Sequence, residues 1–292
     1  YDNPDGTSNG AGFGSSADHA INEPFQFKLT ATLPASKDNG RAYDYYDEYT
    51  VTFHDTLSEG ITFDHWDTVV INNGGSDITI PPEKYTYDVS DQNLTLNIDN
   101  VKSCADGLNL NNGATITVTY TAHLNDKARV NTASGDTKNT NKVYLTYSNN
   151  PKNSASWGKT PESEVYVFTY QLNNTKRQDS ETGDVLAGAG FRLYSDIACN
   201  EEQEIKLKQN EDGTYSRDFS TEGKGVEMKS AEDGTFNVKG LDAGTYYLKE
   251  TSTPTGFNTC PVTTVVIKAN HTGNNVDLTG STINSESVGA SG

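Results

Sequence analysis

Apolar and polar side chains alternate along many short segments of this chain, and most of these segments end at Gly, Pro, Asn or Asp. Because successive side chains of a β-strand point to opposite faces of a sheet, the alternation predicts half-buried strands. No window of about 12 residues has the periodicity of an amphipathic helix. The predicted strands cover residues 25–33, 48–54, 78–80, 94–98, 114–123 and 142–147, then 165–175, 190–194, 213–218, 234–238, 244–250, 263–268 and 277–284.

The two series of strands are separated by a polar stretch at residues 148–162, which contains two prolines. This composition predicts a short, semi-rigid connector between two domains. The predicted fold class is all-β, with two tandem Ig-like β-sandwich domains. We expect a flexible lead-in at residues 1–20, a first sandwich at 21–161 and a second at 162–292.

The chain of 292 residues has a formal net charge of −18, from 22 Lys and Arg against 40 Asp and Glu. This excess of acid argues against nucleic acid partners and against contact with anionic membrane surfaces. Hydrophobic residues make up only 33% of the chain, which would also suit a disordered protein. The 16 Tyr and 10 Phe, set in alternating runs with Val, Ile and Thr, favour strands instead. No apolar stretch approaches the roughly 18–20 residues of a membrane helix.

Motifs of enzymes, cofactors and metals are missing or weak. The chain has no G-x-S-x-G, H-E-x-x-H or P-loop motif, and a nominal dinucleotide motif at residues 12–17 neither follows a predicted strand nor opens a helix. The three cysteines include no C-x-x-C pair, and none of the five His shares a metal-ligand spacing with a Cys. We therefore expect no cofactor, no metal and no turnover enzyme. A secreted β-sandwich hydrolase would require paired carboxylates in an open cleft.

Two charged residues follow the apolar phase of predicted strands. Glu250 alternates with Tyr246 and Leu248, and Lys176 continues the phase that includes Tyr170 and Leu172. A carboxyl and an amine that both point into a β core are costly to bury unless they meet. The pattern predicts a buried Lys–Glu contact, with an ordinary ion pair or strand ends open to water as the alternatives.

The sequence around these two residues resembles a known family. The lysine, polar turn and Leu-Ala-Gly-Ala of residues 176–194 resemble the opening of a CnaB-type domain, and residues 236–257 resemble its close, with the glutamate of the E-box of Gram-positive pilins. The first half resembles the CnaA-like domain that precedes it, in residues 25–34, 51–60, 118–126 and 139–151. Together the halves resemble a sortase-assembled major pilin. The chain contains neither Tyr-Pro-Lys nor Leu-Pro-x-Thr-Gly, so we expect a fragment of such a protein.

In this family a lysine of the first strand joins an asparagine of the last strand in an intramolecular isopeptide bond. The resemblance implies Lys176 as nucleophile, Glu250 as proton shuttle and Asn284 as acceptor in the second domain. Burial would keep both Lys176 and Glu250 neutral, because it lowers the pKa of a lysine and raises that of a carboxyl. This is a single self-processing reaction rather than turnover.

For the first domain the resemblance implies a second bond between Lys28 and Asn141, with Asp55 as the catalytic acid. Asp55 and Asn141 share the apolar phase of their strands, whereas Lys28 lies on the opposite phase from its neighbours. A β-bulge, a sheet covered on both faces, or absence of the bond would each explain the mismatch. Asn139 is the alternative acceptor.

In an exported protein, two of the three cysteines are expected to pair and the third to be a small buried or unpaired thiol. Cys199 and Cys260 lie in the second half, where they match the position of the disulfide in the last domain of shaft pilins, and Cys104 is left over. The resemblance thus implies a Cys199–Cys260 disulfide.

The expected function is that of a structural shaft subunit in an extracellular, cell-wall-anchored pilus, joined to neighbouring pilin subunits by sortase. The alternative is a wall-anchored adhesin stalk whose first domain binds host surface or matrix ligands. Candidate surface aromatics for such binding are Tyr43, Tyr45, Tyr46 and Tyr49, although packing across strands would explain them equally well.

Overall fold

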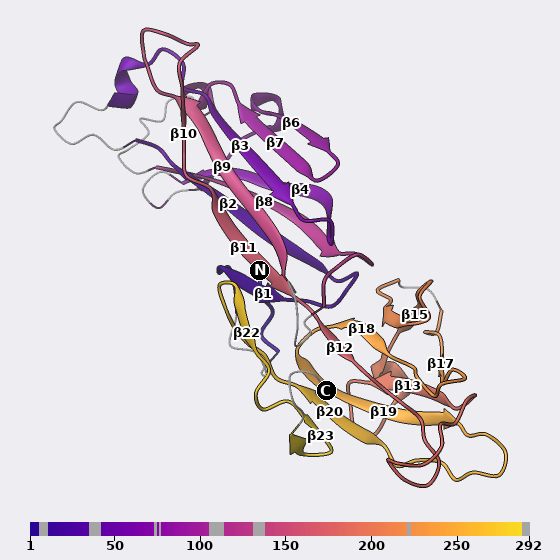
Figure 1. The fold of residues 1–292 in the computed structure, drawn as a ribbon. Coiled ribbons are helices and arrows are strands. Elements are labelled where there is room, and N and C mark those ends of the chain that lie inside the picture. Colours follow the sequence, from indigo (N-terminus) through magenta and orange to yellow (C-terminus); the bar gives the residue numbers. More distant parts are fainter. Residues whose placement is uncertain are drawn as a thin grey trace. The chain divides into compact units, whose positions relative to one another are not determined.

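The structure is a computed structural model that describes residues 1–5, 11–34, 42–72, 75, 77–104, 114–130, 138–220 and 223–287. It divides into two compact units (Figure 1). Unit 1 comprises Tyr1–Pro24, His123–Asn139 and Tyr166–Gly292, and unit 2 comprises Phe25–Ala122 and Thr140–Val165. The division differs from the expected boundaries, because residues 1–24 group with the second half of the chain.

Unit 2 is built around two antiparallel β-sheets. One sheet has the strand order β9-β3-β7-β6, with β10 also paired to β9, and the other has the order β2-β8-β4-β5. The strands are β2 (Pro24–Thr32), β3 (Val51–Leu57), β4 (Ile61–Asn72), β5 (Asp77–Thr79), β6 (Thr86–Ser90), β7 (Asn93–Ile98), β8 (Thr115–Leu124), β9 (Asn139–Ser148) and β10 (Trp157–Lys159).

Unit 1 also contains two main sheets, with the orders β14-β13-β19-β20-β23-β24 and β12-β18-β16-β15, and β17 pairs with β13. Strands β21 and β22 form a separate hairpin, and β1 pairs in parallel with β11. The strands are β1 (Ser16–Asp18), β11 (Ser163–Phe168), β12 (Tyr170–Leu172), β13 (Gly190–Tyr194), β14 (Glu204–Ile205), β15 (Leu207–Gln209), β16 (Tyr215–Arg217), β17 (Met228–Lys229), β18 (Val238–Leu241), β19 (Gly244–Ser252), β20 (Thr263–Ile267), β21 (Asn270–Thr272), β22 (Asn275–Asp277), β23 (Thr282–Ile283) and β24 (Glu286–Ser287).

The predicted all-β fold with tandem β-sandwiches is confirmed. The helical segments in the described part of the chain are short 3-10 turns: η1 (Ala42–Tyr45), η2 (Pro82–Lys84), η3 (Val101–Ser103) and η4 (Glu201–Gln203). None of the described helices has the length and apolarity that crossing a membrane requires.

Alternation along the strands produces the cores, as the sequence predicts. Every second residue of β8 from Ile116 to Leu124 is buried, and β19 buries Tyr246, Leu248 and Glu250 on one face. The core of unit 1 includes a stacked pair of rings, Phe191 and Phe236, whose centroids are 4.1 Å apart. The apolar phase read from the sequence therefore identifies the inward face of these strands.

Two segments differ from the sequence prediction. The longest strand, β4, was not predicted, because its middle part carries Asp64, His65 and Asp67 on no regular alternation. The expected connector at residues 148–162 contains β10, whose Trp157 pairs with Ser148 of β9. Backbone pairing with a neighbouring strand thus gives structure to segments whose side chains carry no strand pattern.

Residues near the start of the chain are anchored within unit 1. The backbone N–H of Ile21 donates to the carbonyl of Gly240 at 2.9 Å, and Ile21 also bridges to Leu124. Ile21 is buried, and Gly240 has a φ of 75°. A Cβ at Gly240 would overlap the Cβ, Cγ1 and Cδ1 atoms of Ile21. Glycine is therefore required twice here, for its backbone conformation and for the close approach of the Ile21 side chain.

We predict that Gly240→Ala lowers the free energy of unfolding by about 2–4 kcal/mol, the sum of left-handed strain and overpacking. Gly213→Ala is the matched control, because Gly213 has a φ of 84° and nothing within 4 Å of an added Cβ. The control should lose only the strain, about 1 kcal/mol. Urea denaturation of both variants measures the difference, and equal losses would contradict the packing of Ile21 on Gly240.

Candidate functional site

Lys176 and Glu250 meet inside unit 1, as the sequence predicts. Lys176 follows β12. Its backbone N–H donates to the carbonyl of Gly234, and its carbonyl accepts from the N–H of Leu186. Glu250 lies in β19 opposite Phe191 of β13, with its side chain on the core face. The Lys176 Nζ atom is 3.2 Å from Glu250 Oε2 and 6.0 Å from the centre of the Phe191 ring. Strand phase and pairing together place the two charges against the apolar core.

Cys260 is the third member of this site. The Lys176 ammonium donates to Cys260 Sγ at 2.7 Å, and the backbone N–H of Cys260 donates to Glu250 Oε2 at 2.6 Å. The second oxygen of the carboxylate, Glu250 Oε1, is buried and accepts no hydrogen bond. The carboxylate thus has one fully occupied oxygen and one that is open to a further donor.

The contact is an ion pair, which corrects the expectation that both groups are neutral. Burial lowers the pKa of Lys176, but its hydrogen bonds to Cys260 and Glu250 outweigh burial and raise that pKa above its ordinary value. Burial raises the pKa of Glu250, but hydrogen bonds from Cys260 and Lys176 lower it below its ordinary value. Each group stabilises the charged form of the other.

The structure does not bring Asn284 to this pair. Asn284 and Ser285 both have positive φ and form the turn between β23 and β24. Asn284 is exposed, and its Oδ1 accepts from the backbone N–H of Thr264 at 2.9 Å. Ile283 instead pairs with the buried Val265. Because side chains alternate along a strand, Ile283 rather than Asn284 lies on the core side of β23.

The three cysteines are free thiols in this structure. The implied Cys199–Cys260 disulfide is not formed here and stays a prediction. Cys260 contacts Glu250, whereas Cys199 lies in the field of Lys249, whose side chain points to the other face of β19. Burial raises the pKa of Cys199, although the charge of Lys249 opposes this.

The predicted acid and amide of the first domain meet in the core of unit 2. Asp55 lies in β3 and Asn141 in the paired strand β9, and both are buried. The Asn141 amide donates to Asp55 Oδ2 at 3.4 Å and to the hydroxyl of Tyr120 at 2.6 Å. That hydroxyl donates to Asp55 Oδ2 at 2.6 Å. Tyr120, on the buried phase of β8, is a member of this site that sequence reasoning missed.

Lys28 does not join Asp55 and Asn141. The alternation of β2 continues through this residue, so Phe27 is buried and Lys28 is exposed. The ring of Phe27 packs 5.4 Å from that of Tyr120, on the side where the family pattern would require an amine. The implied Lys28–Asn141 bond is thus corrected, because neither a bulge nor a second covering layer buries the Lys28 side chain.

Asn139 is already fully engaged elsewhere. Its amide donates to the carbonyls of Arg129 and Val167 at 3.0 and 3.1 Å, and its Oδ1 accepts from the Arg129 N–H at 2.9 Å. These bonds hold the segment before β9 against β11 within unit 1. Asn139 is therefore a structural residue rather than the alternative acceptor.

The tyrosines considered as a binding surface mostly pack on one another. Tyr43 and Tyr49 are buried with ring centroids 5.2 Å apart, and Tyr46 meets Tyr49 edge-on at 5.0 Å. Tyr45 is exposed. Packing explains three of the four rings, so they provide no specific support for a ligand-binding surface.

Comparison with known proteins identifies the fold. Residues 172–282 match the family model SpaA, a prealbumin-like fold domain. No curated protein sequence matches the chain.

Solved structures with the same fold are pilus backbones. The 35 kDa C-terminal fragment of the major pilin GBS80 of Streptococcus agalactiae is 22% identical, with a TM-score of 0.61 over 84% of each chain. The pilus 2b backbone protein of group B streptococcus is 24% identical, with a TM-score of 0.60 over 86% of this chain and 87% of that one. Domains D2 and D3 of the major pilin SpaD of Corynebacterium diphtheriae are 20% identical, with a TM-score of 0.57 over 85% of each. The resemblance to Gram-positive major pilins is therefore confirmed in fold.

The burial of Asp55 predicts how the free energy of unfolding depends on pH. Burial raises the pKa of Asp55 to about 7, against the opposing hydrogen bonds from Tyr120 and Asn141. The folded chain therefore holds this proton more tightly than the unfolded chain, whose carboxyl has its ordinary pKa of 3.8, and stability falls as the pH rises between these values. Asp55→Asn should remove this loss and stabilise the chain at pH 8, by about 4 kcal/mol at most.

The measurement is the free energy of unfolding of wild type and Asp55→Asn at pH 5 and pH 8. The gain should be larger at pH 8, and Asp88→Asn, on the exposed strand β6, should show no such gain. A destabilising Asp55→Asn at pH 8 would mean that the folded core stabilises the ionised carboxylate of Asp55, so that its pKa is not raised.

Proposed function

We propose that this chain is a structural shaft segment of an extracellular pilus that is covalently assembled and anchored to the cell wall. The pilin fold provides the setting, and the observation that carries the proposal is the buried contact of Lys176 with Glu250 in the predicted E-box. A buried amine and acid in this fold are the reactive pair that a self-formed isopeptide bond needs. Neighbouring pilin subunits, joined by sortase, are the partners that follow from this function.

The chemistry begins with the ion pair. Lys176 passes one proton to Glu250, and the neutral amine attacks the side-chain carbonyl carbon of Asn284. A new C–N bond forms between Lys176 and Asn284, and the original C–N bond of the carboxamide breaks. Glu250 donates its proton to the departing nitrogen, which leaves as ammonia, and accepts the second proton that the attacking nitrogen loses. Proximity in the folded core supplies most of the rate, because the two groups react as one molecule.

The reaction requires a register change at the C-terminal strand. A slip of β23 by one residue exchanges the faces of Ile283 and Asn284, because side chains alternate along a strand. The open Oε1 of Glu250 is then available to an amide proton of Asn284. The slip would break the hydrogen bond between the Asn284 side chain and Thr264, which lies at the surface.

A Lys176–Asn284 bond would stabilise the domain against load. It would close the chain from its first strand to its last, and loop closure of this length contributes roughly 4–5 kcal/mol if it behaves like a disulfide. Tension would then pass through a covalent bridge rather than through sheet hydrogen bonds. The packed tyrosines offer no matching observation for the adhesin alternative.

Intact-mass spectrometry tests this proposal. We expect the wild-type chain to be lighter than its sequence by one ammonia, and not by two, because Lys28 is exposed. Lys176→Ala and Glu250→Ala should both restore the full sequence mass. Glu227→Ala is the control, because Glu227 forms an ion pair with Lys229 at 2.7 Å that is more exposed and should leave the loss unchanged.

Peptide mapping of the same samples locates the bond and reports on the Cys199–Cys260 disulfide, which stays a prediction and would remove two further hydrogens. Full sequence mass in the wild type, or an ammonia loss that survives Glu250→Ala, would overturn the crosslink. Circular dichroism of each variant checks that it is folded before its mass is interpreted.

A further inference from the structure

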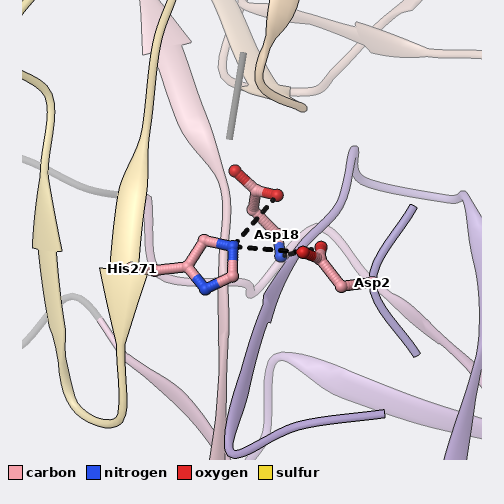
Figure 2. Close-up of side chains that lie close together, drawn as sticks. All are labelled: Asp2, Asp18 and His271. Atoms are coloured by element: carbon pink, nitrogen blue, oxygen red, sulfur yellow. Dashed lines mark hydrogen bonds and ion pairs between the residues drawn. The ribbon is translucent and has the colours of Figure 1, made fainter. Parts of the chain in front are cut away.

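Three donor side chains from distant parts of the sequence converge in unit 1. They are Asp2, Asp18 at the end of β1, and His271 in the middle of β21 (Figure 2). His271 Nε2 lies 3.3 Å from Asp2 Oδ2 and 3.6 Å from Asp18 Oδ1. All three residues are buried, and none of them belongs to the Lys176 site.

In each of these side chains, the polar atom that does not face the other two residues forms a hydrogen bond elsewhere. His271 Nδ1 is hydrogen-bonded to Ser16 Oγ at 2.9 Å, and Asp18 Oδ2 accepts from the Tyr170 hydroxyl at 2.8 Å. Asp2 Oδ1 accepts from the backbone N–H of Asp18 at 3.1 Å. Outer hydrogen bonds of this kind orient the ligands of protein metal sites. Here they orient His271 Nε2, Asp2 Oδ2 and Asp18 Oδ1 toward one another.

Two of the atoms at that point have no hydrogen bond. Asp2 Oδ2 and Asp18 Oδ1 are buried, accept no hydrogen bond, and belong to side chains that are each only 1% exposed. Buried carboxylate oxygens are costly to leave without a donor or a cation. Their position facing His271 Nε2 indicates that a positive centre belongs between them.

We propose that Asp2, Asp18 and His271 form a Zn²⁺ site with an open fourth position. Zinc binds imidazole nitrogen and carboxylate oxygen at about 2.0–2.2 Å in tetrahedral geometry, which sets neighbouring ligand atoms about 3.3–3.6 Å apart. The two observed separations from His271 Nε2 match this spacing. The mixed nitrogen and oxygen donors suit zinc, whereas Ca²⁺ requires six to eight oxygens, about twice as many ligands.

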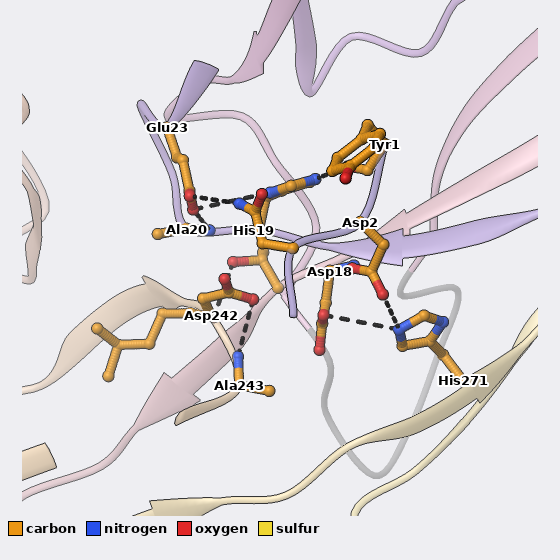
Figure 3. Close-up of polar contacts among 12 residues, drawn as sticks. Tyr1, Asp2, Asp18, His19, Ala20, Glu23, Asp242, Ala243 and His271 are labelled. Carbon is orange, nitrogen blue, oxygen red and sulfur yellow. Dashed lines mark hydrogen bonds and ion pairs between the residues drawn. The ribbon is translucent and has the colours of Figure 1, made fainter. Parts of the chain in front are cut away.

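The charge balance of the surroundings favours a divalent ion. Two carboxylates and a neutral imidazole balance Zn²⁺, whereas a proton on His271 leaves one negative charge in excess. Asp242 lies close by (Figure 3), and its carboxylate is within 4.8 Å of those of Asp5 and Asp18. Burial, together with the charges of Asp18, Glu23 and Asp5, raises the pKa of Asp242 well above its ordinary value.

In this structure His271 Nε2 is within ion-pair distance of both carboxylates, and the Phe168 ring lies 6.2 Å from the imidazole. A metal ion at this point would take the place of that ion pair.

The site would fasten the first residues of the chain to β21. Asp2 and Asp18 belong to the N-terminal segment, and His271 belongs to the hairpin β21–β22 near the other end. A bound ion stabilises the folded chain by mass action, since the unfolded chain does not hold the three ligands together. This inference does not depend on the proposed shaft function or on the isopeptide bond.

Isothermal titration of the metal-free chain with Zn²⁺ at pH 7.5 tests the site. We expect one equivalent to bind, and His271→Gln to weaken binding by at least about 100-fold, since even the loss of an outer partner costs 10–100-fold. His65→Gln is the matched control, because His65 is exposed and faces a single carboxylate, Asp67, at 3.2 Å. This control should bind Zn²⁺ as the wild type does.

Two further measurements keep the test decisive if His271→Gln folds poorly. Asp2→Asn preserves shape and should also weaken binding, and Co²⁺ should produce the intense visible bands of a tetrahedral site in the wild type but not in Asp2→Asn. No uptake of Zn²⁺ and Co²⁺ by the wild type, or equal binding by His271→Gln or Asp2→Asn, would overturn the proposal.

Discussion

Burying an ionised side chain between two β-sheets costs several kcal/mol unless an opposite charge or a hydrogen-bond donor meets it. In this chain the alternation of side chains along each strand determines which of them face inward. Charged residues on the inward face are therefore buried and cannot be solvated by water. Lys176 and Glu250 satisfy each other as an ion pair at 3.2 Å. The position of β12 relative to β19 depends on that contact, because removing either partner would leave an uncompensated charge in the core of unit 1.

The buried acids of the chain meet this constraint in different ways. Glu250 stays ionised because Lys176 and the Cys260 N–H stabilise its negative form. Asp55 instead accepts hydrogen bonds from the neutral donors Tyr120 and Asn141, and burial raises its pKa into the neutral range. Similar β-sandwich cores thus hold a permanent ion pair in one unit and a carboxyl that titrates near neutrality in the other. The difference arises from whether strand parity supplies an amine, as it does for Lys176 and does not for Lys28.

In the proposed shaft role the chain would have to resist unfolding under load with few apolar residues, since these make up 33% of the chain. Contacts between the two ends of a domain are the most effective for this purpose, because they restrict the longest loop. The proposed Lys176–Asn284 bond would be such a link within the second domain. The cluster of Asp2, Asp18 and His271 relates the start of the chain to β21 in the same way, through polar groups rather than through the apolar core.

Strand alternation was enough to predict the all-β fold, the buried phase of β2, β8 and β19, and the meeting of Lys176 with Glu250, because a period of two is a local property of the backbone. Tertiary structure decided what depends on partners distant in sequence. It paired β4 and β10 despite their irregular patterns, inserted Tyr120 between Asp55 and Asn141, and turned Asn284 to the surface. It also gathered donors from positions 2, 18 and 271, which no motif spacing could reveal. Sequence determines which face a side chain takes, whereas the folding of distant strands against each other determines what it meets there.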